Sequence, residues 1–574
     1  MYLPATKHEM KQLGWDRCDV ILVTGDSYID SPYIGVAVIG KVLTDAGYKV
    51  GVIAQPDIGN DKDIQRLGEP ALFWGVSGGS VDSMVANYTA LKKKRRSDDY
   101  TPGGENIRRP DRAVIAYSNL IRRYFKETVP IVIGGIEASL RRIAHYDYWS
   151  NKVRGSVLFD AKADYLLYGM AERSIVELAK ALAGGKDTDG IKGLCYKSTQ
   201  MPEGYLKLPE LAEVKKDKQQ FWKMFQLFYD QNDPITAKGL VQLHDTRYLI
   251  QNPPQPYLSQ KELDHVSNLT YEYDVHPLDA KQGKVRALET IRFSIKTHQG
   301  CYGECNFCSI ALHEGRTVRW RSEDSILREA KRIISLPGFK GYLLDAGGPT
   351  ANMYGFECSK KLKSGACKDQ SCIYPEVCKS LKPTHEPYRR LLAKLAKLPG
   401  MKKVFVSSGI RYDLLFDDKK GASAFMEQLT AEHVSGQLKI APEHTDDRVL
   451  KNMRKPSFDL TIKFKAWFDH LSRKVNKKQF LTYYFITGYP GCTENNTRAM
   501  RKVVSNELKL IPEQVQIFTP TPSTLATAMY YTESDGPNGD PIYVEKDVGK
   551  KRRQVDIFQG NEQRERVDQR KRGR

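Results

Sequence analysis

The chain has 574 residues and a formal net charge of +20. Hydrophobic residues make up 40% and charged residues 28%, which is ordinary for a soluble globular protein and excludes a disordered or fibrous one. No run of about 18 apolar residues occurs, and the N-terminus lacks the pattern of a secretory signal. We expect a multidomain cytoplasmic protein with no membrane segment. The basic charge permits an acidic partner such as nucleic acid but locates no site.

Residues 1–190 alternate short apolar strands with helices, which predicts a doubly wound parallel α/β sheet. In such sheets ligands bind beyond the carboxyl ends of the strands. No G-x-G-x-x-G run follows the first strand, so a dinucleotide is not indicated. The predicted strands are Val20–Thr24, Lys49–Ala54, Ala71–Val76, Ala113–Ala116, Ile131–Gly135 and Asp164–Tyr168.

Residues 191–285 are polar and rich in Lys, Gln and Pro, and we interpret them as a connecting segment with a few helices. The alternation resumes over 286–530, where six strand–helix units predict a partial barrel with a cysteine-rich insertion at 356–380. Residues 531–574 form a basic tail that we expect to be poorly ordered at its end. The predicted strands are Ile291–Ile295, Gly341–Asp345, Val404–Ser408, Gln437–Ala441, Leu481–Ile486 and Gln514–Phe518.

The first strand of this second part is followed by three cysteines at C-x3-C-x2-C spacing, Cys301, Cys305 and Cys308. Three thiolates can hold three irons of a four-iron cluster and leave the fourth iron open to a small molecule. Zinc normally takes four ligands, often in C-x2-C pairs, and fits this loop less well. Phe307, before the last cysteine, would shield a cluster from water.

The loop resembles the hallmark of the radical-SAM superfamily, C-x3-C-x2-C with an aromatic residue before the last cysteine. Further stretches resemble the YgiQ-type radical-SAM proteins across nearly the whole chain. They include SVDSMVANYTALKKKRRSDDYTPGG, RPDRAVIAYSNLIR, GGIEASLRRIAHYDYW, DAGGPTANMYG, SSGIRYDL, APEH, FITGYPGCTE and FTPTPST.

This resemblance implies an N-terminal cobalamin-binding-like domain followed by a partial (β/α)6 TIM-type barrel. It implies that Cys301, Cys305 and Cys308 bind a [4Fe–4S] cluster whose fourth iron is chelated by S-adenosylmethionine (SAM). One electron, from a donor such as flavodoxin or ferredoxin, would cleave SAM to a 5′-deoxyadenosyl radical that acts on a substrate the sequence does not name. Cobalamin is not expected, because the chain lacks the D-x-H-x-x-G motif of proteins that ligate cobalt with histidine.

The resemblance also assigns roles to residues at the ends of the barrel strands. The turn Gly347-Gly348-Pro349 would contact the methionine amino group of SAM. Ser408 and Arg411 would meet the ribose and the carboxylate, and Gly488 would line the adenosine. Glu443 and His444 are candidates for substrate contact or proton transfer, with a structural His–Glu pair as the alternative.

A second set of four cysteines, Cys358, Cys367, Cys372 and Cys378, lies in the insertion. This segment has little apolar content, so a metal would supply stability. Four thiolates suit either a structural zinc or a second iron–sulfur cluster, and the irregular spacing leaves both open. The alternative to a radical-SAM enzyme is a basic nucleic-acid-binding protein, or an RNA-modifying enzyme, with a structural or redox-sensing cluster.

Overall fold

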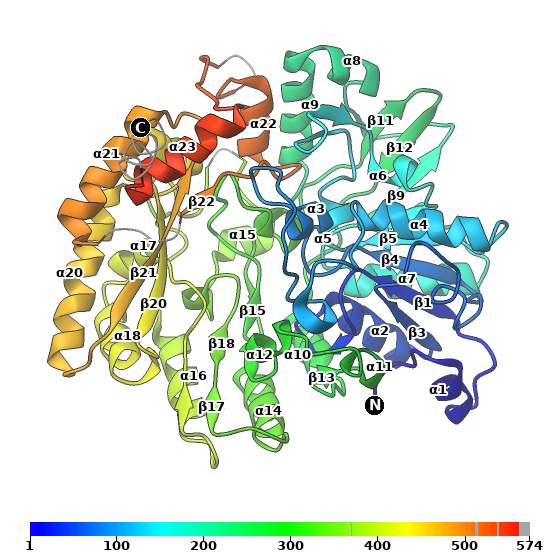
Figure 1. Ribbon diagram of the computed structural model, residues 1–574, viewed down its shortest axis with the longest axis horizontal. Coiled ribbons are helices and arrows are strands. Elements are labelled where there is room, and N and C mark those ends of the chain that lie inside the picture. The colour runs from blue at the N-terminus through cyan, green and yellow to red at the C-terminus, as the bar shows by residue number, and fades with distance from the viewer. Residues whose placement is uncertain (369, 511–514, 537–538, 562–574) are drawn as a thin grey trace, which may run out of the picture. The chain divides into compact units, whose positions relative to one another are not determined.

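The computed structural model describes residues 1–368, 370–510, 515–536 and 539–561. The chain divides into two compact units (Figure 1). The first contains Met1–Lys296 and Leu312–Gly315, and the second contains Thr297–Ala311 and Arg316–Arg574. Within the described residues, no helix is both long and apolar enough to span a bilayer.

The first unit is built on a nine-stranded sheet with the order β10-β11-β12-β9-β8-β5-β4-β1-β3. Its central strands β3, β1, β4, β5 and β8 are parallel, as predicted, with helix α2 (Gly35–Asp45) between β1 and β3 in sequence and helix α7 (Glu172–Ala183) after β8. The strands are β1 (Val20–Thr24), β3 (Val50–Ala54), β4 (Phe73–Ser77), β5 (Ile131–Gly134), β8 (Tyr165–Leu167), β9 (Leu194–Ser198), β10 (Leu206–Lys207), β11 (Leu240–His244) and β12 (Arg247–Gln251).

The structure differs from the prediction over 191–285, which is not a simple connection. Strands β9, β11 and β12 extend the sheet with antiparallel pairs. Their polar side chains are buried but bonded: Gln242 accepts from the Ala144 N–H at 2.9 Å, and Gln251 accepts from Arg142 at 3.1 Å. Buried polar groups with partners cost little, so polar strands can lie inside a sheet.

The predicted strand Ala113–Ala116 is also wrong. These residues begin helix α4 (Ala113–Tyr124), which buries Tyr117, Leu120 and Ile121 at helical spacing. A four-residue apolar run cannot by itself distinguish a strand from the start of a buried helix.

In the second unit, parallel strand pairs join β17 to β19 and β20 to β21 to β22. Backbone hydrogen bonds connect these strand pairs to one another. The Ala346 N–H donates to the Phe405 carbonyl, and the Ile410 N–H donates to the Lys439 carbonyl. The α/β class and the partial barrel are thereby confirmed. The strands are β17 (Tyr342–Leu343), β18 (Asp345–Gly347), β19 (Lys403–Val404), β20 (Gln437–Glu443), β21 (Phe480–Thr487) and β22 (Gln516–Ile517). Helices include α14 (Glu323–Ile334), α16 (Glu386–Ala396), α20 (Phe458–Lys474) and α21 (Glu494–Val503).

The basic tail is partly a folded helix. Helix α23 (Val548–Gln559) follows α22 (Leu525–Thr532) and packs on α21 and β21. Lys551 is buried on it and donates to the Tyr530 hydroxyl at 2.9 Å. The predicted disorder at the end of the tail falls mainly on residues 562–574, outside the described residues.

Candidate functional site

Two of the three cysteine sulfurs, those of Cys301 and Cys305, lie beside Gly303. A Cβ placed on this glycine would lie 3.2 Å from Cys301 Sγ and 3.6 Å from Cys305 Sγ. The Gly303 N–H donates to Cys301 Sγ at 3.3 Å, and the Cys308 N–H closes the loop onto the Cys305 carbonyl at 2.9 Å. Burial raises the pKa of the Cys301 and Cys308 thiols. Thiolates there therefore need a positive partner.

Neighbouring elements fix the path of the loop. Asn306 donates its N–H to the Met453 carbonyl at 3.1 Å and its side-chain amide to the Asn452 carbonyl at 2.7 Å. Glu304 has φ of 43° and pairs with Arg316 at 2.8 Å. Phe307 meets the ring of Tyr489 edge-on at 6.3 Å between centroids. The loop is thus held in place by contacts on several sides.

Arg411 brings a cation to the cysteines. Its side chain is buried, and its Nε donates to Asp413 at 3.0 Å. Its Nη1 lies 3.5 Å from Cys305 Sγ. Burial opposes the charge, but Asp413 and the nearby cysteines raise the pKa of Arg411, so the guanidinium stays protonated. The Arg411 side chain, which we predict to bind SAM, therefore points toward the sulfur of Cys305.

A series of buried hydrogen bonds holds the Arg411 backbone in place. The Asn352 side chain accepts the Arg411 N–H at 2.8 Å and donates to its carbonyl at 2.9 Å. Asn352 also lies 3.0 Å from His385 Nε2, and His385 Nδ1 lies 2.8 Å from Asp418. Although burial opposes it, hydrogen bonds from His385 and Gly421 lower the pKa of Asp418 to about 2. Sequence reasoning missed these supports because their residues lie 33 to 59 positions apart.

Glu443 ends β20 in an unusual backbone conformation. The register of β20 against β21 shifts between Ile440 and Glu443, which marks a bulge, and Glu443 has φ of 70°. Bulges and left-handed non-glycine residues often occur where a side chain is re-aimed at a functional site. Burial raises the pKa of Glu443, while Lys455, 3.8 Å away, and Arg411 lower it.

His444, the next residue, has its ring in a different environment. It is 0% exposed, and its Nδ1 accepts the Asp446 N–H at 2.9 Å. Its Nε2 lies 3.4 Å from the buried Cys492 sulfur, and burial lowers its pKa to about 4. These contacts favour a structural role for His444, and Glu443 is the stronger of the two candidates for chemistry.

Asp345, just before the predicted SAM turn, holds the neighbouring segment at Ser407 and Ser408. This carboxylate accepts the N–H groups of Ser407 and Ser408 at 2.8 and 3.1 Å, and it also accepts the Ser408 hydroxyl. The Gly347 carbonyl accepts the Thr297 N–H at 2.7 Å. A Cβ on Gly348 would lie 2.7 Å from His298 Nε2, so the glycine is needed for this contact.

Gly488 meets the C-terminal helix. It has φ of 65°, and its N–H donates to the Gln554 side chain of α23 at 2.9 Å. Gln554 also lies 3.5 Å from the Cys492 carbonyl. The turn at the end of β21 is thus tied to α23, a contact the sequence did not predict because that region was interpreted as a tail.

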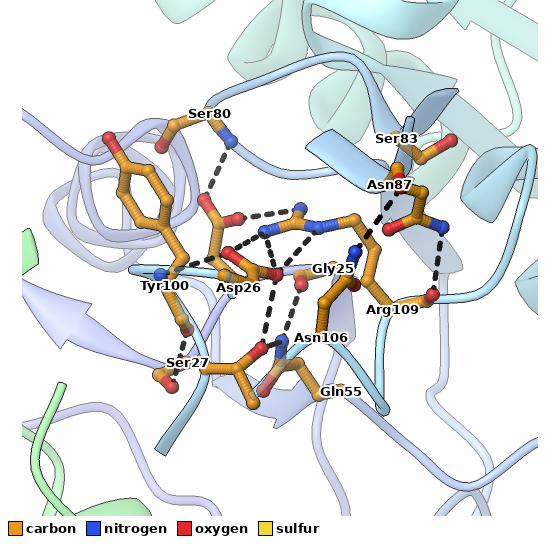
Figure 2. Close-up of polar contacts among 12 residues, drawn as sticks. Gly25, Asp26, Ser27, Gln55, Ser80, Ser83, Asn87, Tyr100, Asn106 and Arg109 are labelled. Atoms are coloured by element: carbon orange, nitrogen blue, oxygen red, sulfur yellow. Dashed lines mark hydrogen bonds and ion pairs between the residues drawn. The ribbon is translucent and has the colours of Figure 1, made fainter. Parts of the chain in front are cut away.

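At the carboxyl edge of the first unit's sheet lies an ion-pair network (Figure 2). Arg109 Nη1 pairs with Asp26 at 2.8 Å and donates to the Gly78 carbonyl at 2.7 Å, and Nη2 pairs with Asp98 at 3.0 Å. A Cβ on Gly79, which has φ of 107°, would lie 2.6 Å from Arg109. Glycine at this position therefore serves the chain's own packing.

Comparison with known proteins identifies the same two parts of the chain. The family model described as radical SAM N-terminal matches residues 2–294, and that described as radical SAM superfamily matches 295–504. A UPF0313 protein of Fusobacterium nucleatum is 54% identical over 97% of this chain and 98% of its own. A UPF0313 protein of Thermotoga petrophila is 48% identical over 96% of each chain.

Solved structures resemble the chain only loosely. The radical SAM methyltransferase TsrM of Kitasatospora setae, with tryptophan and a SAM analogue, has a TM-score of 0.47 and 15% identity over 88% of this chain and 75% of its own. The cobalamin-dependent SAM radical enzyme OxsB, with aqua-cobalamin and SAM, has a TM-score of 0.45 and 13% identity over 85% and 52%.

The expectation that cobalamin is absent was wrong as a prediction. Both enzymes named above are described with cobalamin bound, TsrM in a second structure that also contains a [4Fe–4S] cluster. The motif D-x-H-x-x-G concerns only a histidine ligand to cobalt, so its absence does not decide whether the cofactor binds. With the family models and the full-length relatives in agreement, the chain belongs to the radical-SAM superfamily, as a member of the UPF0313 proteins.

Proposed function

We propose that the chain binds a [4Fe–4S] cluster and SAM and cleaves SAM reductively to a 5′-deoxyadenosyl radical that acts on a substrate. One observation carries the proposal: Cys301 and Cys305 point their sulfurs at one space beside Gly303, with the Arg411 cation 3.5 Å from Cys305. Among the described residues, no three His, Cys, Asp or Glu side chains lie close enough together to hold a metal ion, so binding at either cysteine set would draw the sulfurs together.

The residues present fit this cofactor. Cys301, Cys305 and Cys308 would be its ligands, the Gly303 N–H would donate to a cysteine sulfur, and Arg411 would offset the negative charge. When bound, the cluster would supply the electron that breaks a carbon–sulfur bond of SAM. A reductant such as flavodoxin or ferredoxin would renew it.

The chain's own groups would orient SAM and exclude water. Ser408 is held by Asp345, and Gly347 accepts the Thr297 N–H, so both are positioned before SAM binds. Gly488 is held by Gln554. Arg411 binds Asp413 through Nε and directs its Nη1 donor toward Cys305 Sγ. The carboxylate of bound SAM would compete with that sulfur for the Nη1 hydrogen bond.

We assign Glu443 to substrate contact or proton transfer. Because burial raises its pKa despite the nearby cations Lys455 and Arg411, the carboxylate takes up a proton more readily than an ordinary glutamate. Its left-handed backbone and the bulge before it are consistent with a side chain held in place for function. It would accept a hydrogen bond or a proton from substrate.

The test is SAM cleavage by anaerobically reconstituted, dithionite-reduced protein. We expect 5′-deoxyadenosine and methionine from the parent protein and loss of both in Cys305→Ala, because a cluster ligand is gone. Cys195→Ala is the matched control, since Cys195 is a buried cysteine of β9. Cleavage by Cys305→Ala at the parent rate would overturn the ligand assignment, and no cleavage by fully loaded parent protein would overturn the function.

A further inference from the structure

The insertion between β18 and α16 contains four cysteines that the proposed reaction does not use. Cys358, Cys367, Cys372 and Cys378 are all free thiols. Cys358 is the N-cap of helix α15 (Ser359–Ser364), and Gly365, with φ of 84°, ends that helix. The helix therefore lies between the first two cysteines, and the turn at Gly365 leads the chain to Cys367.

Side chains and backbone bring the cysteines near one another. The Gln370 amide lies 3.9 Å from Cys367 Sγ and 3.8 Å from Cys378 Sγ, so it sits between those two sulfurs. The Cys378 N–H donates to the Cys372 carbonyl at 2.9 Å and closes the last loop. Cys358 is part of a buried cluster with Tyr302, Ile373 and Leu381, and Cys372 and Cys378 pack against the same cluster.

The charge around these sulfurs favours a negative centre. Lys361 is buried, and its Nζ lies 3.5 Å from Cys372 Sγ and 3.4 Å from Glu357. Residues 356–382 contain six lysines and three acidic residues. Four thiolates with one zinc ion, or with one [4Fe–4S]²⁺ cluster, carry a net negative charge that this positive excess would offset.

Apart from that buried cluster, the described part of the segment has little regular structure of its own. Its regular structure among the described residues is the six-residue helix α15, and a helix of that length is not stable by itself. The Ser371 hydroxyl beside Cys372 is buried without a hydrogen-bond partner among the described residues, and sulfur bound to a metal accepts such donors.

From the cysteines, the buried lysine and the shared amide, we propose that Cys358, Cys367, Cys372 and Cys378 form a four-thiolate metal centre, separate from the Cys301–Cys308 loop. Binding would draw the four sulfurs together, displacing the Gln370 amide from between two of them. The ion is zinc or iron in a cluster, since both accept four thiolates.

The experiment removes the cysteines of the first site, so that metal bound at the second site can be measured alone. The triple variant Cys301→Ala, Cys305→Ala, Cys308→Ala is purified without oxygen, and iron, zinc and sulfide are measured per chain. We expect it to retain either one zinc or about four irons with sulfide, which decides between the two centres. A triple variant with neither metal in stoichiometric amount overturns the proposal, whatever the result for SAM cleavage.

A second measurement assigns the ligands. Adding Cys372→Ala and Cys378→Ala to the triple variant should abolish the remaining metal, whereas adding Cys18→Ala and Cys195→Ala should not. If the first combination does not fold, the triple variant is treated with a chelator under native conditions instead. Four additional thiols should then react with a thiol reagent as the metal leaves, and release of metal with no new reactive thiol would refute the assignment.

Discussion

Two buried arginines, one in each unit, show how similar chemistry serves different ends. Arg109 of the first unit meets two carboxylates, Asp26 and Asp98, and a carbonyl, so its donors face the chain's own acceptors. Arg411 of the second unit meets one carboxylate, Asp413, and turns Nη1 to Cys305. Arg411 comes soon after the parallel strand β19, whereas Arg109 reaches Asp26 and the Gly78 carbonyl, which come directly after β1 and β4. The fold determines where a ligand site can form, and the number of acceptors around the cation determines whether a donor is left for a ligand.

The largest effect is expected from Arg109→Met. This change leaves Asp26 and Asp98 buried without their cation, which should destabilise the first unit by about 3–5 kcal/mol. Chemical denaturation followed by circular dichroism measures the loss. The control is Arg122→Met, since Arg122 pairs with Asp164 in a partly exposed position and should cost at most about 1 kcal/mol. Equal losses in the two variants would mean that the Arg109 network is not a structural centre.

A smaller effect, dependent on pH, is expected from His444. Burial lowers its pKa to about 4, and the unfolded value is about 6.5. Below pH 6.5 the unfolded chain therefore gains a proton that the folded chain lacks, so the contribution is complete above this pH and declines as pH falls toward 4. We expect a loss of about 2 kcal/mol by pH 5.

The corresponding test compares urea unfolding at pH 7.5 and pH 5 for the parent protein and His444→Gln. The variant should lose less stability on acidification. His470→Gln alters an exposed histidine of α20 and should behave like the parent protein. An equal loss of stability on acidification in the parent protein and in His444→Gln would contradict a buried, neutral His444.

The smallest effect in free energy concerns Arg411. The double variant Arg411→Met, Asp413→Asn removes the cation without stranding its carboxylate, so folding should be retained. Loss of the hydrogen bond from Arg411 Nη1 to Cys305 Sγ should lower the reduction potential of a bound cluster by on the order of 60 mV, which is a tenfold change in a one-electron equilibrium. A redox titration followed by electron paramagnetic resonance measures it, and an unchanged potential would contradict the role of Arg411.

Sequence patterns within a few residues predicted the strands and helix ends that depend on neighbouring residues alone. Val20–Thr24 is a strand because an apolar run of that length is buried on both faces, and Ser322 caps α14 by accepting the Ser325 N–H. The cysteine loop was predictable because its ligands are close in sequence. The supports of Arg411 were not, since Asn352, His385 and Asp418 are common polar residues whose pairing depends on the tertiary fold.

The bond between Gly488 and Gln554 has a consequence for synthesis. Cys308 precedes Gln554 by 246 residues. At a ribosomal rate of about 5–20 residues per second, the cysteine loop leaves the ribosome roughly 10 to 50 seconds before α23 can cover the end of β21. During that interval the second unit is incomplete, so a cell that makes this protein in air would have to load or protect the cysteines while translation continues.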